Sequence, residues 1–292
     1  MENTKISRLA TAALVIGSIV GTYFFAGPRN KKRRTDVVPE YQDELETNLI
    51  TPVGGTFAAV WPVIYTGTLG LAVHQALPSQ VNNPRYDKAA PWLVVNYLLN
   101  GLFGVFFSRG EKKARVAANA ITVTTLPTVL ALHQALGVGQ TPDVLQPEKT
   151  FHRAAGIYAG WITVATGVAT TNLLIEAGYR VSRERAVPFA VGLLGVLGAI
   201  GIAVSKKLND PYYLLPFVAG FTGVAAKQAG RNEAVAAVAG TLALISAGVF
   251  VQRIQEGQAA NATLPEPEQT QFDAAEEARE EMDHEPYYID LD

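Results

Sequence analysis

The chain has 292 residues, of which 49% are hydrophobic and 17% are charged, and its formal net charge is −2. Soluble domains usually carry about 25% charged residues, so this composition disfavours an ordinary soluble globular protein. The absence of cysteine excludes disulfides and thiolate metal sites, and the absence of Walker, HExxH and GxSxG motifs disfavours ATP-driven and hydrolytic chemistry.

Eight apolar stretches, each about the length of a bilayer crossing, follow one another along the chain. They begin near Leu9, Gly54, Pro91, Val116, Ala154, Ala186, Pro211 and Ala234. A helix of about 20 predominantly apolar residues crosses roughly 30 Å of hydrocarbon, and the stretches lack the alternation of strands. The sequence therefore predicts an all-α polytopic transmembrane helical bundle of about eight spans, multi-pass in the cell membrane, in contact with the lipid bilayer and without a nucleic-acid partner.

Basic residues accumulate in alternate loops. The loops after the first, third and fifth spans are the most basic, at residues 29–34, 109–115 and 180–185. Because Lys and Arg are enriched in short cytoplasmic loops, these loops are predicted to face the cytoplasm. With eight spans, both termini then lie on the opposite side of the membrane.

Polar side chains within the spans are expected to face the bundle interior or a cavity. The candidates are Asn96, Asn100, Asn119 and Asn172. Asn100, near the middle of its span, could form a hydrogen bond between helices or line a pocket, and such bonds contribute roughly 0.6–2 kcal/mol. No Asp, Glu, Lys or Arg is expected deep within a span, which disfavours a proton- or sodium-coupled pump.

Two similar segments place histidine at the ends of the second and fourth spans. Residues 71–77 read LAVHQAL and residues 130–136 read LALHQAL, which puts His74 and His133 at comparable depth. A paired site for haem iron or zinc is one interpretation. The other is that both imidazoles lie in the interfacial zone and bond to water, and the lack of an evident third ligand favours it.

Aromatic residues recur at helical spacing in two spans. Trp61 and Tyr65 are four residues apart with Phe57 one turn earlier, and Tyr158 and Trp161 are three apart, so each set shares one helix face. Such a stripe can build a flat slot for a planar apolar ligand. Composition alone also allows ordinary helix packing and interfacial anchoring.

These stripes resemble signatures of the TspO/translocator-protein family. Residues 57–65, FAAVWPVIY, resemble its second-helix F-x-x-V-W-x-x-L-Y motif, and residues 99–103, LNGLF, resemble its third-helix L-N-x-x-W with Phe103 in place of Trp. Residues 158–166, YAGWITVAT, are similar to its fifth-helix Y-x-x-W-x-x-x-A-T. The longer layout is similar to the "tryptophan-rich sensory protein" branch of this family.

The resemblance implies three parts: a TspO-like five-helix membrane core at residues 1–177, three additional transmembrane helices at 178–254, and an acidic tail at 255–292 that its composition predicts to be disordered. It also implies a non-enzymatic protein that binds a planar apolar ligand, tetrapyrrole-like or sterol-like, as a sensor or carrier. No cofactor would be required, although the ligand could be a porphyrin or a haem-like molecule. The implied ligand-binding residues are Trp61, Tyr65, Asn100, Tyr158, Trp161 and Ala165.

Two other functions and one assembly are consistent with the sequence. A facilitative small-molecule transporter could use Pro62, Pro188 and Pro216 as hinges. A structural membrane subunit could dock a partner through the acidic tail. A homodimer could form through the glycine face of the sixth span, which contains Gly192, Gly195, Gly198 and Gly201.

Overall fold

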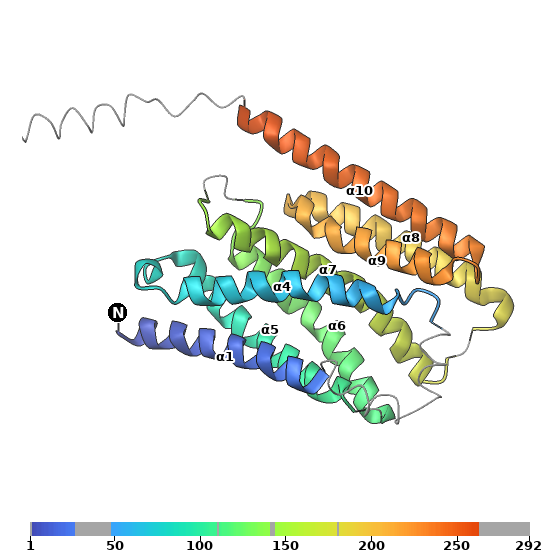
Figure 1. The fold of residues 1–292 in the computed structure, drawn as a ribbon, viewed down its shortest axis with the longest axis horizontal. Helices are drawn as coiled ribbons and strands as arrows, with labels where there is room; N and C mark the ends of the chain where they lie inside the picture. The colour runs from blue at the N-terminus through green and yellow to red at the C-terminus, as the bar shows by residue number, and fades with distance from the viewer. Residues whose placement is uncertain (1, 27–47, 110, 141–143, 180, 263–292) are drawn as a thin grey trace, which may run out of the picture. The chain divides into compact units, whose positions relative to one another are not determined.

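The computed structural model describes residues 2–26, 48–109, 111–140, 144–179 and 181–262, and most of these residues lie in helices (Figure 1). The α-helices are α1 (Glu2–Ala26), α4 (Gly54–Gln75), α5 (Pro84–Phe107), α6 (Lys112–Ala135), α7 (Glu148–Glu176), α8 (Arg183–Leu208), α9 (Leu215–Gln228) and α10 (Glu233–Ala262). Two short 3₁₀ helices, η2 (Pro78–Gln80) and η3 (Pro211–Leu214), precede α5 and α9. The polytopic all-α prediction is confirmed over these residues.

Six of the helices, α1, α4, α5, α6, α8 and α10, are long and apolar enough to cross a membrane by themselves. The exceptions have different causes. Helix α7 has 29 residues but begins with charged and polar side chains. It also packs against more elements than any other helix, so fewer of its side chains can face lipid. Helix α9 has only 14 residues.

Five helices form a closed ring. Helix α1 packs on α4 and α5, α4 packs on α7, α7 packs on α6, and α6 packs on α5. Close approach between α4 and α7 depends on Gly67, because a Cβ atom there would overlap that of Ala154. The helices of this ring come from residues 2–176, and the division of the chain into a five-helix core and additional helices stays a prediction.

Helices α8 and α9, together with η3, pack on α7 as well, and α9 also contacts α4. A Cβ atom at Gly160 would collide with the Tyr213 carbonyl oxygen of η3, so glycine is required for this approach. Helix α10 joins the same core, where Val235 and Ala239 are fully buried. Residues Met1–Phe250 therefore form one compact unit, and the described part of the second unit, residues 251–262, continues α10.

Polar contacts identify the two ends of the ring. At one end, His133 near the end of α6 contacts Asp210 before η3. At the other end, Gln228 at the end of α9 donates to the Leu49 carbonyl, five residues before α4 begins. Residues 211–228 therefore run from one end to the other. Their rises of 2.0 and 1.5 Å per residue give a length of roughly 29 Å, so η3 and α9 together span the length predicted for the seventh crossing.

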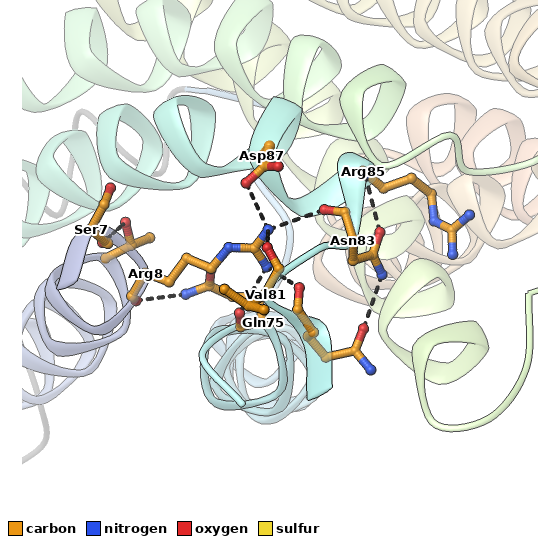
Figure 2. Close-up of polar contacts among 9 residues, drawn as sticks. Ser7, Arg8, Gln75, Val81, Asn83, Arg85 and Asp87 are labelled. Carbon is orange, nitrogen blue, oxygen red and sulfur yellow. Dashed lines mark hydrogen bonds and ion pairs between the residues drawn. The ribbon is translucent and has the colours of Figure 1, made fainter. Parts of the chain in front are cut away.

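Arg8 of α1 forms hydrogen bonds with the end of α4, with the connection between α4 and α5, and with the start of α5 (Figure 2). Its Nη1 donates to the carbonyls of Gln75 and Gln80 at 3.1 and 2.6 Å. Its Nη2 donates to the carbonyls of Val81 and Asn83 at 3.2 and 3.1 Å, and to Asp87 Oδ1 at 2.7 Å. Gln75 Nε2 returns a hydrogen bond to the Arg8 carbonyl at 2.9 Å. The guanidinium is therefore buried, 2% exposed as a residue, with its charge facing oxygen atoms.

The glycine face of the predicted sixth span is partly used inside the chain. Gly198 lies against Leu242 of α10, and Gly201 lies against Phe217 of α9. Gly192 and Gly195 have no neighbouring atom within 4 Å of an added Cβ. Only the first half of this face is therefore available to a second copy.

Candidate functional site

Three aromatic side chains follow one another along successive turns of α4. Phe57, Trp61 and Tyr65 are spaced by four residues, which keeps them on one helix face. The Trp61 and Tyr65 rings are stacked, with centroids 4.9 Å apart and planes 28° apart. The stripe thus presents a continuous aromatic surface about two helical turns long.

Trp161 of α7 completes the cluster by meeting this stripe edge-on. Its ring centroid lies 6.2 Å from that of Trp61 at an interplanar angle of 79°, and 5.3 Å from that of Phe57 at 86°. Trp161 is only 2% exposed, whereas Phe57 is 37% exposed. We call Phe57, Trp61, Tyr65 and Trp161 the aromatic cluster. It has a buried wall on α7 and a side that is open to the surroundings of the helices.

Asn100 of α5 borders the aromatic cluster and is 6% exposed. Its Oδ1 and Nδ2 atoms each lie 3.5 Å from the Tyr65 hydroxyl oxygen, which is the long limit for a hydrogen bond. The Thr22 hydroxyl of α1 donates to Asn100 Oδ1 at 3.1 Å. The amide oxygen is thus well engaged, while the amide nitrogen forms only a long contact and retains capacity to donate.

Tyr158 lies about one turn before Trp161 on α7, and its ring is close to that of a second tyrosine. It is 2% exposed, and its ring centroid is 6.3 Å from that of Tyr97, which precedes Asn100 by almost one turn of α5. Ala165 follows Trp161 by four residues and is half-buried. Of the six residues implied by the resemblance, the structure brings Trp61, Tyr65, Asn100 and Trp161 into direct contact, and it places Tyr158 and Ala165 one helical turn to either side of Trp161.

The sequence interpretation omitted Tyr97 from the site. It lies three residues before Asn100 on the same face of α5, and it is 1% exposed. Helical spacing from Asn100 was the signal that could have identified it.

The two histidines of the repeated segments have separate protein partners. His74 Nδ1 lies 2.7 Å from the Tyr86 hydroxyl, and His133 Nε2 lies 3.0 Å from Asp210 Oδ2. His133 is only 1% exposed, so the interpretation that it bonds to water is wrong, whereas for the half-buried His74 that interpretation stays a prediction. Among the described residues, no group of three or more His, Cys, Asp or Glu side chains could hold a metal ion.

A charged group joins α5 to the beginning of α7, ahead of the apolar stretch that starts near Ala154. Arg85 Nε and Nη2 donate to the two Glu148 carboxylate oxygens at 2.7 and 2.9 Å. Burial raises the pKa of Glu148, but the hydrogen bonds and charge of Arg85 outweigh burial and hold that pKa below its ordinary value. Burial lowers the pKa of His152, although Glu148 Oε1 lies 3.5 Å from its Nε2.

A chain of polar contacts also joins helices at the opposite end of the ring. Asn48 Nδ2 donates to Asn172 Oδ1 at 2.7 Å, and Asn172 Nδ2 donates to Asn119 Oδ1 at 3.3 Å. Arg115 Nε pairs with Glu176 Oε1 at 2.6 Å. Asn119 and Asn172 thus bond between α6 and α7.

A family model described as "TSPO-like protein" matches residues 7–252, which include all of the helices of the five-helix ring except the first residues of α1, and most of the remaining helices. No curated protein and no solved structure matches the chain. The assignment to the "tryptophan-rich sensory protein" branch stays a prediction. The family match and the six long apolar helices agree with the motifs of the second, third and fifth spans. The chain therefore belongs to the TSPO-like protein family and is a multi-pass membrane protein.

Proposed function

We propose that the protein binds a planar apolar ligand, tetrapyrrole-like or sterol-like, at the aromatic cluster and serves as a sensor or carrier. The observation that carries this proposal is the meeting of the α4 stripe with Trp161 of α7. Flat ring faces favour flat ligands because stacked and edge-to-face contacts contribute about 0.5–1.5 kcal/mol beyond the area that they bury.

The exposure of the aromatic cluster and a hydrogen-bond donor beside it support the same proposal. Phe57 is 37% exposed and Trp61 is half-buried, so an apolar molecule dissolved in the bilayer can reach the aromatic cluster from its open side. The Asn100 amide nitrogen supplies a directed donor beside the rings, because its contact with Tyr65 is long. This combination of an apolar surface with few polar groups is typical of small-molecule sites.

The proposed protein holds its ligand without changing it chemically. The aromatic cluster and Asn100 offer ring faces and an amide, which bind by contact and hydrogen bonding. A porphyrin would be a ligand in this scheme, and no resident cofactor would be required.

Titration of the purified protein with protoporphyrin IX tests the proposal. We expect saturable quenching of tryptophan fluorescence and a matching change in porphyrin absorbance. The Trp61→Ala and Trp161→Ala variants should each bind about 10-fold more weakly, which corresponds to about 1.4 kcal/mol. Trp92→Phe is the matched control, because Trp92 is 37% exposed and belongs to no ring contact among the described residues.

Other results would support the alternatives. Ligand flux in liposomes without tight binding would favour a facilitative transporter. Of the three prolines proposed as hinges, Pro62 and Pro188 lie inside α4 and α8, but Pro216 lies in the first turn of α9, where proline fits without bending a helix. Capture of a partner that depends on residues 263–292, which lie outside the described residues, would favour a structural subunit. A homodimer also stays a prediction.

A further inference from the structure

Two buried tyrosine hydroxyls inside the five-helix ring have no hydrogen-bond partner among the residues that the structure describes. They belong to Tyr97 of α5 and Tyr158 of α7, which are 1% and 2% exposed. Their rings lie 6.3 Å apart at an interplanar angle of 40°. Two donors of the same kind, from helices that are not neighbours in the ring, thus meet in its interior.

Unpaired hydroxyls at such positions are uncommon. The large majority of buried side-chain polar atoms have a partner, and one without any loses its hydration with no compensation. The pair is also unlike the other buried tyrosines. The Tyr86 hydroxyl lies 2.7 Å from His74 Nδ1, and the Tyr213 hydroxyl lies 2.6 Å from Thr163 Oγ1. Among the described tyrosines, the buried hydroxyls without a partner are therefore those of Tyr97 and Tyr158, which lie near Asn100.

The nearby polar groups already serve other partners. The Thr68 hydroxyl lies close to that of Tyr97 without hydrogen-bond geometry between them, and it donates to the Ile64 carbonyl at 2.9 Å. Asn100 Oδ1 accepts from Thr22. Tyr97 precedes Asn100, which contacts Tyr65, by three residues on α5, and Tyr158 precedes Trp161 by three residues on α7. The two orphan donors are thus adjacent to the aromatic cluster.

We propose that the Tyr97 and Tyr158 hydroxyls donate hydrogen bonds to a neutral acceptor oxygen, such as a carbonyl, on the ligand that the aromatic cluster binds. This inference rests on the proposed function and specifies its ligand as a planar apolar molecule that carries an uncharged acceptor group. Neutral chemistry is favoured because none of the cation–π contacts among the described residues involves Tyr97 or Tyr158, and an unpaired anion is costly away from water.

Two porphyrins that differ in acceptor oxygens test the inference. Protoporphyrin IX dimethyl ester carries neutral ester carbonyls, and octaethylporphyrin carries no oxygen. The wild-type protein should bind the ester more tightly. Tyr97→Phe and Tyr158→Phe should each weaken binding of the ester about 5- to 10-fold and should change binding of octaethylporphyrin less than twofold, because they remove only a hydroxyl.

Thermal unfolding without ligand gives an independent readout. Because the hydroxyls are unpaired in the protein, the Tyr97→Phe and Tyr158→Phe variants should unfold at the wild-type temperature or above it. Tyr213→Phe is the matched control. It removes a bonded hydroxyl outside the ring interior, so it should lower the unfolding temperature by about 2–4 °C and leave the preference between the porphyrins intact.

The outcomes are distinguishable. If the wild-type protein binds neither porphyrin, the proposed function fails for this ligand class and the inference fails with it. If both porphyrins bind and the Tyr97→Phe and Tyr158→Phe variants keep the full preference for the ester, the inference alone is wrong. A drop in the unfolding temperature of both variants would show that the hydroxyls are paired within the protein, which would also overturn it.

Discussion

Arg8 illustrates how one side chain secures an end of the bundle. It donates to four backbone carbonyls and to the Asp87 carboxylate, all within residues 75–87. The planar, forked guanidinium suits several acceptors at once, whereas a lysine ammonium is a single point of charge. We therefore expect Arg8→Ala to lower the free energy of unfolding by about 2–4 kcal/mol, and Arg8→Lys to recover little of this loss.

Thermal unfolding in detergent measures this prediction. Lys207→Ala removes the same charge from an exposed position at the end of α8, so it should change the stability by less than about 0.5 kcal/mol. An Arg8→Ala variant as stable as the Lys207→Ala control would contradict the role assigned to the Arg8 contacts.

Helical spacing along the sequence predicts which residues share a helix face, but not which distant residues they contact. The helical spacing of Phe57, Trp61 and Tyr65 identified the α4 stripe, because an i, i+4 pattern is a local property. The role of Arg8 was not predictable in this way, since its partners lie 67–79 residues away. His74 and His133 sit in nearly identical segments but contact Tyr86 and Asp210, respectively. Their partners come from elements that only tertiary packing brings near.

At the scale of elements, glycine determines how closely η3 approaches α7. A Cβ atom at Gly160 would collide with the Tyr213 carbonyl, whereas one at Gly192 of α8 would meet nothing within 4 Å. Gly160→Ala should therefore destabilise the protein by about 1–3 kcal/mol through overpacking. Gly192→Ala should stabilise it by about 0.5–1 kcal/mol, because alanine loses less backbone entropy in a helix.

The opposite signs of these two substitutions provide the check. Both place one methyl group in a helix of the same protein, and thermal unfolding reports both. Equal effects from Gly160→Ala and Gly192→Ala would mean that η3 does not pack on α7 as described.

The sequence predicted the presence of the helices better than the residues at which they begin or are interrupted. The apolar stretches located all of the described α-helices, since apolar length is the dominant signal for a span. The break at Leu214, between η3 and α9, was not predicted, although Pro211 and Pro216 each fit the first turn of a helix. Helix α7 began at Glu148 rather than near Ala154, because Arg85 and other protein groups compensate its polar first turn.

At the scale of the whole molecule, acid should weaken the fold through the charged group at the start of α7. Because burial lowers the pKa of His152 in the fold, the unfolded chain takes up a proton at this imidazole more readily than the folded protein does, so stability falls as the pH drops below about 6.5. The lowered pKa of Glu148 adds stability above about pH 4.5, which is lost as the pH falls through its value in the folded protein. Each proton contributes at most about 1.4 kcal/mol per pH unit.

Unfolding temperatures between pH 8 and pH 4 measure this dependence. The His152→Gln variant should show a flatter profile than the wild type between about pH 6.5 and 5, and should keep the decline at lower pH that Glu148 causes. A wild-type profile that rises on acidification from pH 7 to 5.5, or an unchanged slope in His152→Gln, would contradict the assignment.

The position of α7 has a consequence for biosynthesis. Translation and membrane insertion proceed from the amino terminus, so α7 is complete before α8, η3 and α9 are made. Until then, its Gly156 and Gly160 face lacks the elements that fill it in the finished protein. In the newly made five-helix ring, one face of α7 therefore stays uncovered until the later part of the same polypeptide has been synthesised and packs on it.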